Sequence, residues 1–173
     1  RDRGIRVATS SYTRHHVNIT MCKAKANGNY INSILALREA MDAGFEEALL
    51  LDNEGYVAEG SGENVFLVRD NVLYTPELTS CLEGITRDSI FRIAADQGLT
   101  VKEKRITRDE VYVADEAFFT GTAAEVVPIR EVDHRRIGSG TRGPVTETLQ
   151  RIYLESVRAG QPEYADWLAP VVN

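Results

Sequence analysis

The feature that most constrains the fold is the alternation of helical and strand patterns along the chain. Apolar residues recur at helical spacing in 29–44, 85–98 and 143–160. Between these stretches lie short apolar runs typical of buried strands, notably 45–52 and 116–121. Hairpin patterns interrupt the alternation, so it is not the strict succession of a purely parallel sheet. We therefore expect an α/β domain built on a mixed sheet.

Local signals place several of these elements. In the first helical stretch the spacing rests on Ile31, Ile34, Leu35 and Met41, and Gly44 is a natural stop. Strand patterns at 65–68 and 72–74 flank a three-residue turn and predict a hairpin. Residues 99–106 suggest another strand and 107–114 a short helix. Residues 126–132 and 135–140 resemble edge strands, since a proline such as Pro128 suits an edge.

Length and composition limit the class of protein. The 173 residues suffice for one domain, and neither repeats nor a clear linker divide them. A net charge of -6 argues against nucleic acid or an anionic membrane as the main partner. No run of eighteen apolar residues spans a bilayer. Two cysteines, Cys22 and Cys81, are too few for a disulfide scaffold and favour a reducing compartment, the cytoplasm.

Three glycine-containing corners are candidates for chemistry. Gly84–Thr86 opens a helix, whose N-terminal N–H groups suit a phosphate, and Gly121–Ala124 ends a strand with similar groups. Taken alone, the first is more often a threonine cap and the second a tight turn. The third corner, 59–64, holds Glu59 and Glu63, which suggests an acid/base pair or a metal site. No Asp/His spacing supports a metal, and the histidines and serines show neither ligand spacing nor a nucleophile motif.

The stretch Lys23 to Tyr30, KAKANGNY, holds two lysines before a flexible turn. Alone it favours a solvated loop. Together, however, AKANGNYINSIL, YVAEGSGENVFLV, LEGITRDSI and ADEAFFTGTAAEVVPIREVD resemble the fold-type IV aminotransferases, also called class IV. The resemblance is collinear from about Ser10 to Trp167 and is closest to the branched-chain amino acid aminotransferases. It implies a partly barrel-like large domain that binds pyridoxal 5'-phosphate.

The resemblance assigns roles by position. Lys25 matches the lysine that forms the Schiff base and shuttles protons, whereas Lys23 matches no role and is expected at the surface. Tyr30 matches the partner of the cofactor's phenolate oxygen, and Glu59 that of its pyridine nitrogen. The remaining matches are phosphate ligands and donors to the substrate carboxylate: Ile85, Thr86 and Thr122 for the phosphate, and Thr122 and Ala123 for the substrate. Glu63 and Asn64 are expected to anchor the loop, and Arg87 to form a salt bridge.

The resemblance also sets expectations for the whole protein. We expect residues 1–173 to be the cofactor-binding large domain, with the family's N-terminal small domain absent from this chain, which begins Arg1-Asp2-Arg3 without methionine. The implied reaction transfers amino groups from leucine, isoleucine or valine to 2-oxoglutarate, in a homodimer. The alternatives are a D-amino acid or amine transaminase, aminodeoxychorismate lyase, or a cofactor-binding domain without turnover.

Overall fold

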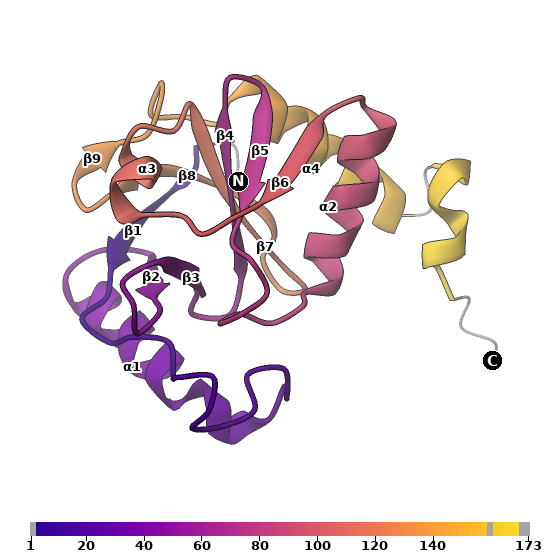
Figure 1. The fold of residues 1–173 in the computed structure, drawn as a ribbon. Helices are drawn as coiled ribbons and strands as arrows, with labels where there is room; N and C mark the ends of the chain where they lie inside the picture. Colours follow the sequence, from indigo (N-terminus) through magenta and orange to yellow (C-terminus); the bar gives the residue numbers. More distant parts are fainter. Residues whose placement is uncertain (1–2, 159–160, 170–173) are drawn as a thin grey trace.

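A computed structural model describes residues 3–158 and 161–169, and a mixed sheet forms its centre (Figure 1). Among these residues the strands are β1 (Ile5–Thr9), β2 (Glu47–Leu51), β3 (Val57–Gly60), β4 (Asn64–Arg69), β5 (Val72–Thr75), β6 (Thr100–Glu103), β7 (Glu116–Gly121), β8 (Glu125–Val132) and β9 (Arg135–Arg136). Their order is β3-β2-β1-β8-β7-β4-β5-β6, and β9 pairs with β8. The pairs β1–β2, β1–β8 and β5–β6 are parallel and the others antiparallel. The predicted mixed sheet is confirmed.

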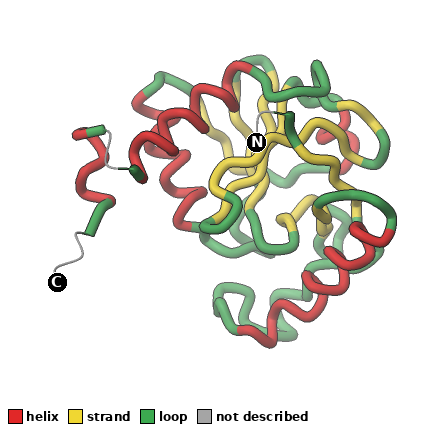
Figure 2. The backbone as a smooth tube through the Cα atoms, turned by 180° about the vertical axis from the view of Figure 1, so that it is seen from behind, coloured by secondary structure: helices red, strands yellow, loops and turns green. Residues whose placement is uncertain are grey.

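The helices follow the predicted stretches. They are η1 (Asn27–Tyr30), α1 (Ile31–Asp42), α2 (Ile85–Asp96), α3 (Arg108–Tyr112), α4 (Pro144–Val157) and η2 (Pro162–Trp167), where η denotes a 3₁₀ helix. Ala159 and Gly160, at the end of the last predicted stretch, lie outside the described residues. Helices α2 and α4 lie together beside the sheet, whereas α1 lies at its other end (Figures 1 and 2).

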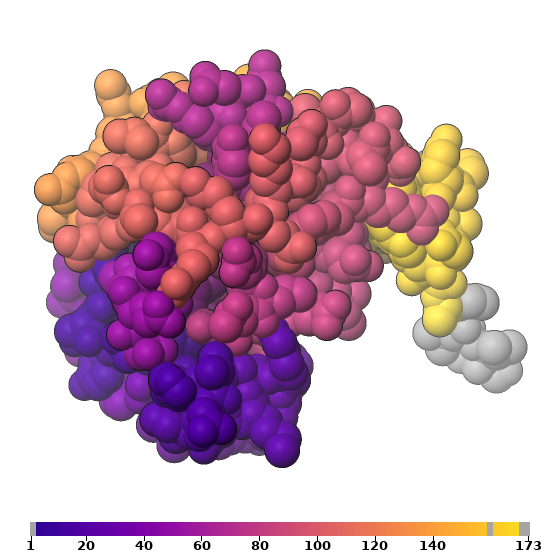
Figure 3. All heavy atoms as spheres, viewed as in Figure 1, coloured from indigo at the N-terminus to yellow at the C-terminus, as the bar shows by residue number. Residues whose placement is uncertain are grey.

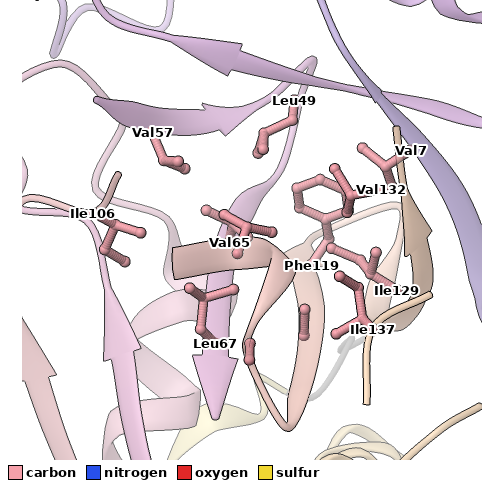
Figure 4. Close-up of a cluster of buried hydrophobic side chains, with 13 residues drawn as sticks. Val7, Leu49, Val57, Val65, Leu67, Ile106, Phe119, Ile129, Val132 and Ile137 are labelled. Atoms are coloured by element: carbon pink, nitrogen blue, oxygen red, sulfur yellow. The ribbon is translucent and has the colours of Figure 1, made fainter. Parts of the chain in front are cut away.

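Alternate residues of the central strands pack into two separate clusters. Val65 and Leu67 of β4 join the cluster around which the sheet curls, together with Phe119 of β7 (Figure 4). Their neighbours Phe66 and Phe118 point to the opposite face and pack against α2 and α4. Both faces of these strands are therefore buried, which explains their nearly continuous apolar runs. The curled sheet confirms the partly barrel-like fold.

The β4–β5 hairpin is present, but its turn has two residues rather than the three predicted, because Arg69 pairs with Val72 in the ladder. Asp70 and Asn71 adopt φ values of 50° and 59°. Positive φ at both central residues is the type I′ geometry that matches the twist of the flanking strands, and Asn and Asp tolerate it best after glycine. The turn therefore fixes the register of β4, which begins beside the pocket described below.

Helix α1 faces the opposite way to what its apolar spacing suggests. The apolar residues at helical spacing remain exposed, Ile31 and Ile34 by 62% and 63%, while Ser33, Ala36 and Ala40 are buried. Small side chains let the helix approach β2 closely, and Ala36 and Ala40 pack there with Leu50. The apolar face is thus a surface of the described chain.

The prediction of an edge strand at 126–132 is wrong. Strand β8 lies inside the sheet, between β1 and β7. Pro128 is opposite Phe118 of β7, but the ladder with β1 begins only at the next residue, where Ile129 pairs with Ile5. The missing N–H of Pro128 therefore removes no hydrogen bond to β1.

Candidate active site

One pocket of about 310 Å³ gathers the predicted site residues from distant parts of the chain. It is formed by the loop before α1, the β3–β4 turn, the segment entering α2 and the end of β7. Its lining includes Lys23, Lys25, Tyr30, Glu59, Glu63, Asn64, Gly84, Ile85, Thr86, Thr120 and Thr122. Ala123 is not part of the lining and lies exposed in the turn between β7 and β8.

Lys25 and Tyr30 meet at the mouth of the pocket. The Lys25 Nζ donates to the Tyr30 hydroxyl at 3.1 Å. The η1 turn brings them together, and Asn29 braces it by donating through its side-chain amide to the carbonyls of Met21 and Ala24. The Asn-Gly-Asn run is thus a turn held by hydrogen bonds that places Lys25 beside Tyr30, rather than a free loop.

Lys23 is exposed, as expected, but its ammonium group is bound. The Lys23 Nζ donates to the carbonyl oxygens of Leu78 and Cys81, the latter at 2.9 Å. It therefore ties the lysine segment to the loop that leads into α2. Of the two lysines, only Lys25 keeps its amine directed at a pocket side chain.

Glu59 is a buried carboxylate with a partner that sequence reasoning missed. Only 5% of Glu59 is exposed, and its Oε1 lies 2.6 Å from the Arg14 Nε. The Leu82 N–H donates to Oε2 at 3.1 Å. Burial raises the pKa of Glu59, while Arg14 and the Leu82 N–H oppose that rise. Arg14 lies in a polar turn, and no local pattern distinguishes it from a surface arginine.

Asn64 anchors the segment that enters α2. Its side-chain amide donates to the Leu82 carbonyl at 2.9 Å. Its Oδ1 lies where a Cβ on Gly84 would sit, only 2.1 Å from that position. Glycine is therefore required at this corner by close packing rather than by an unusual φ. The anchoring expected for Asn64 is present.

The N-terminus of α2 opens onto the pocket. The helix begins at Ile85 after Gly84, which supplies no side-chain cap. The first N–H groups of a helix have no intrahelical partner and attract anions. The Thr86 hydroxyl is 3.4 Å from that of Tyr153, and Arg87 forms the expected salt bridge, with Glu103. This end of the pocket suits a phosphate.

The end of β7 adds polar groups opposite α2. Thr122 lines the pocket, as does Thr120, whose hydroxyl is buried without a hydrogen-bond partner among the described residues. Sequence reasoning missed Thr120 because it reads as an ordinary strand residue. Glu63 also lines the pocket, and its Oε2 is buried without a partner among the described residues. Those residues contain no group of acidic, histidine or cysteine side chains suited to a metal.

The curled mixed sheet matches that of solved aminotransferases of the fold-type IV class, and its pocket gathers the lysine, the buried carboxylate and the two glycine corners expected for that class. The chain belongs to the family of class IV aminotransferases, because the model of that family, "Amino-transferase class IV", matches residues 1–132. Every helix in the part of the chain that the structure describes is too short or too polar to span a bilayer.

Comparison with individual proteins agrees. The chain is 65% identical to a branched-chain-amino-acid aminotransferase of Pseudomonas aeruginosa over 95% of its own length and 53% of the relative's. It is 43% identical to the Salmonella typhimurium enzyme of that name, over 98% of this chain and 55% of the relative. A branched-chain amino acid aminotransferase from Thermobaculum terrenum, solved in its PLP-form, superimposes with a TM-score of 0.96 at 42% identity, over 99% and 57%. The chain thus spans about half the length of the curated relatives it matches.

Proposed function

We propose that the protein containing this chain is a pyridoxal-phosphate-dependent aminotransferase that moves amino groups between leucine, isoleucine or valine and 2-oxoglutarate. One observation carries the proposal: Lys25, Tyr30, Glu59, Thr86 and Thr122 line a single pocket. Related proteins that share most of this chain carry the name branched-chain-amino-acid aminotransferase, which favours these substrates over those of a D-amino acid or amine transaminase or of aminodeoxychorismate lyase.

The pocket residues fit the cofactor. The volume of the pocket lies near the lower end of the range for small-molecule sites. The Thr120 hydroxyl lacks a partner among the described residues, and the first residues of α2 line the same pocket, so both can donate to a bound anion. The Glu59 carboxylate lines the same pocket and is buried. The lining therefore offers groups for a phosphate and a carboxylate for a ring nitrogen.

Each residue has a distinct task in this proposal. Bound pyridoxal phosphate supplies a ring that accepts electrons from the substrate α-carbon. Lys25 Nζ would hold the cofactor and move the proton at that carbon. Glu59 would hold a proton at the ring nitrogen, and Tyr30 would bond the phenolate oxygen. Ile85, Thr86 and Thr122 would bind the phosphate, and the N–H groups of Thr122 and Ala123 the substrate carboxylate.

Lys25→Ala and Lys23→Ala test the assignment as a matched pair in the full-length protein. We expect Lys25→Ala to lose the visible absorbance of bound pyridoxal phosphate and all glutamate formation from leucine and 2-oxoglutarate. Lys23→Ala should keep both, with weaker cofactor binding because the 78–81 loop loses its anchor. The reverse pattern would contradict the assignment. A wild-type protein that binds the cofactor without any transfer would instead be a binding domain, and transfer from D-alanine alone would favour the D-amino acid alternative.

Two further properties belong to the proposal. A homodimer is supported by the exposed apolar face of α1, since contiguous apolar surface marks interaction sites. A cytoplasmic location is supported by Cys22 and Cys81, both free and buried.

A further inference from the structure

Arg14 and Glu59 form an ion pair that is closed off from solvent. Arg14 is 3% exposed and Glu59 5%, and the Nε–Oε1 distance is 2.6 Å. Exposed pairs such as Arg38–Asp42 contribute little, because water screens both charges. In a buried pair, removal of one partner leaves the other charge uncompensated. The state of Glu59 therefore depends on Arg14.

Both oxygens of the Glu59 carboxylate are held. Arg14 binds Oε1, and the Leu82 N–H donates to Oε2 at 3.1 Å. The ion pair at one oxygen and the hydrogen bond at the other together hold the carboxylate in place. Leu82 and Glu59 both line the pocket, whereas Arg14 does not belong to the lining. Arg14 thus acts on the pocket only through the groups it holds.

The same guanidinium ties together the segments that form the pocket. Arg14 Nε donates to the Ser80 carbonyl and Nη1 to the Asn29 carbonyl, both at 3.3 Å. Asn29 directly precedes Tyr30, and Ser80 lies in the loop that leads to Leu82. The backbone N–H of Arg14 donates to the carbonyl of Leu51, at the end of β2. Arg14 therefore connects several of the segments that surround the pocket.

We propose that Arg14 is a positioning residue whose ion pair holds the Glu59 carboxylate in place and in its anionic form at the pocket. The inference rests on the proposed function, in which anionic Glu59 holds a proton at the ring nitrogen. Burial by itself favours the neutral acid, which cannot do so. The other charged or titratable groups that act on Glu59 are Lys23 and Lys25, and the Cys81 thiol lies nearby. Both lysines donate to other groups, so Arg14 is the direct counter-ion of Glu59.

The first test compares Arg14→Gln, Arg14→Lys, Glu59→Gln and the double variant Arg14→Gln/Glu59→Gln, with the exposed Arg38→Gln as control. At pH 7 Arg14→Gln should lower kcat roughly 10- to 100-fold, because the anionic form of Glu59 loses its buried counter-ion, with little change in KM. The deficit should shrink as pH rises, because alkali ionises Glu59. Arg14→Lys should restore part of the rate. In the Glu59→Gln background, Arg14→Gln should add little.

The second test uses the cofactor-free protein and needs no activity. Without Arg14, folding raises the pKa of Glu59 further above its unfolded value, so stability is lost as pH rises through the folded pKa. The Tm deficit of Arg14→Gln against wild type should therefore widen from pH 5 to pH 8, while the deficit in kcat narrows. The double variant should show no such widening. Opposite trends in the two deficits would not arise from a residue that merely supports packing.

Each outcome decides the proposal. Wild-type kcat in Arg14→Gln, or a Tm deficit that does not vary with pH, overturns it. If Arg14→Gln does not fold, a folded double variant supports it, because removal of the unpaired charge restores the fold, whereas an unfolded double variant overturns it. A wild-type protein without amino transfer refutes the proposed function, and the two Tm series still decide whether Arg14 keeps Glu59 anionic.

Discussion

At the scale of single residues, Glu59 and Glu63 are two pocket carboxylates in opposite surroundings. Arg14 compensates Glu59, whereas the Oε2 of Glu63 is buried without a partner among the described residues. Glu47 lies near Glu63, where its own carboxylate accepts the N–H groups of Ala48 and Ser61. Burial, with the Glu47 charge second, raises the pKa of Glu63 to about 7. The second glutamate therefore titrates near neutrality.

This titration predicts how stability varies with pH. The folded pKa of Glu63 lies above its unfolded value, so the stabilisation is fully present below about pH 4.5 and is lost as pH rises through about 7. Glu63→Gln, which resembles the neutral form, should nearly equal wild type in the free energy of unfolding at pH 4 and exceed it at pH 8 by at most about 3 kcal/mol. Urea unfolding of the cofactor-free protein at both values measures the difference. The exposed Glu83→Gln is the control, and parallel results for the two variants would refute the prediction.

At the scale of elements, the entry into α2 depends on close packing between a glycine and an asparagine. A Cβ on Gly84 would lie 2.1 Å from the Asn64 Oδ1, and Asn64 is held by its bond to the Leu82 carbonyl. No other atom lies within 4 Å of a Cβ built on Gly28, in the η1 turn. Neither glycine has a positive φ, so alanine at the two positions differs in the crowding of its Cβ rather than in backbone strain.

Gly84→Ala should move the segment that opens α2. We expect a loss of roughly 1–3 kcal/mol in the free energy of unfolding, the usual cost of overpacking, together with weaker pyridoxal phosphate binding. Gly28→Ala should leave both nearly unchanged. Urea unfolding and cofactor titration measure the two effects. Equal behaviour of the two variants would show that the Asn64–Gly84 contact does not shape the phosphate end of the pocket.

At the scale of the whole molecule, large apolar side chains are exposed both on α1 and on the loop before it. Ile34 is 63% exposed, and Ile19 and Met21 of that loop 73% and 80%. The N-terminal loop and α1 form the lower part of the face shown in Figure 3. Exposed apolar side chains gathered on one helix fit a two-fold interface, in which the same surface meets its copy.

Ile34→Lys should therefore weaken the proposed homodimer, because it places a charge within apolar surface that would be buried. Val113→Lys is a matched control, since Val113 is 60% exposed and lies after α3. Light scattering during size-exclusion chromatography of the full-length protein should show a dimer for wild type and Val113→Lys, and a shift toward monomer for Ile34→Lys. A monomeric wild type would refute the homodimer, and an unchanged Ile34→Lys would place its interface elsewhere.

Local sequence determined the features that depend on near neighbours. The helix and strand periods, the β4–β5 hairpin and the glycine corners were readable because backbone preference and side-chain spacing act over a few residues. The resemblance supplied roles for Lys25 and Glu59 that periodicity alone could not, and the structure brings both to one pocket. The roles that the resemblance assigns to these two residues are predictions that the variants above test.

Tertiary structure decided the features that depend on distant partners. It set which face of α1 is buried, the interior place of β8 and the anchoring of Lys23. It likewise brought Glu116 to the N-terminus of α4, where it accepts the N–H groups of Val145 and Thr146. The Arg14–Glu59 pair belongs with these. Burial and ion pairing arise between residues far apart in the chain, so no local pattern carries them, and only the packed sheet reveals that the pocket's carboxylate has a counter-ion.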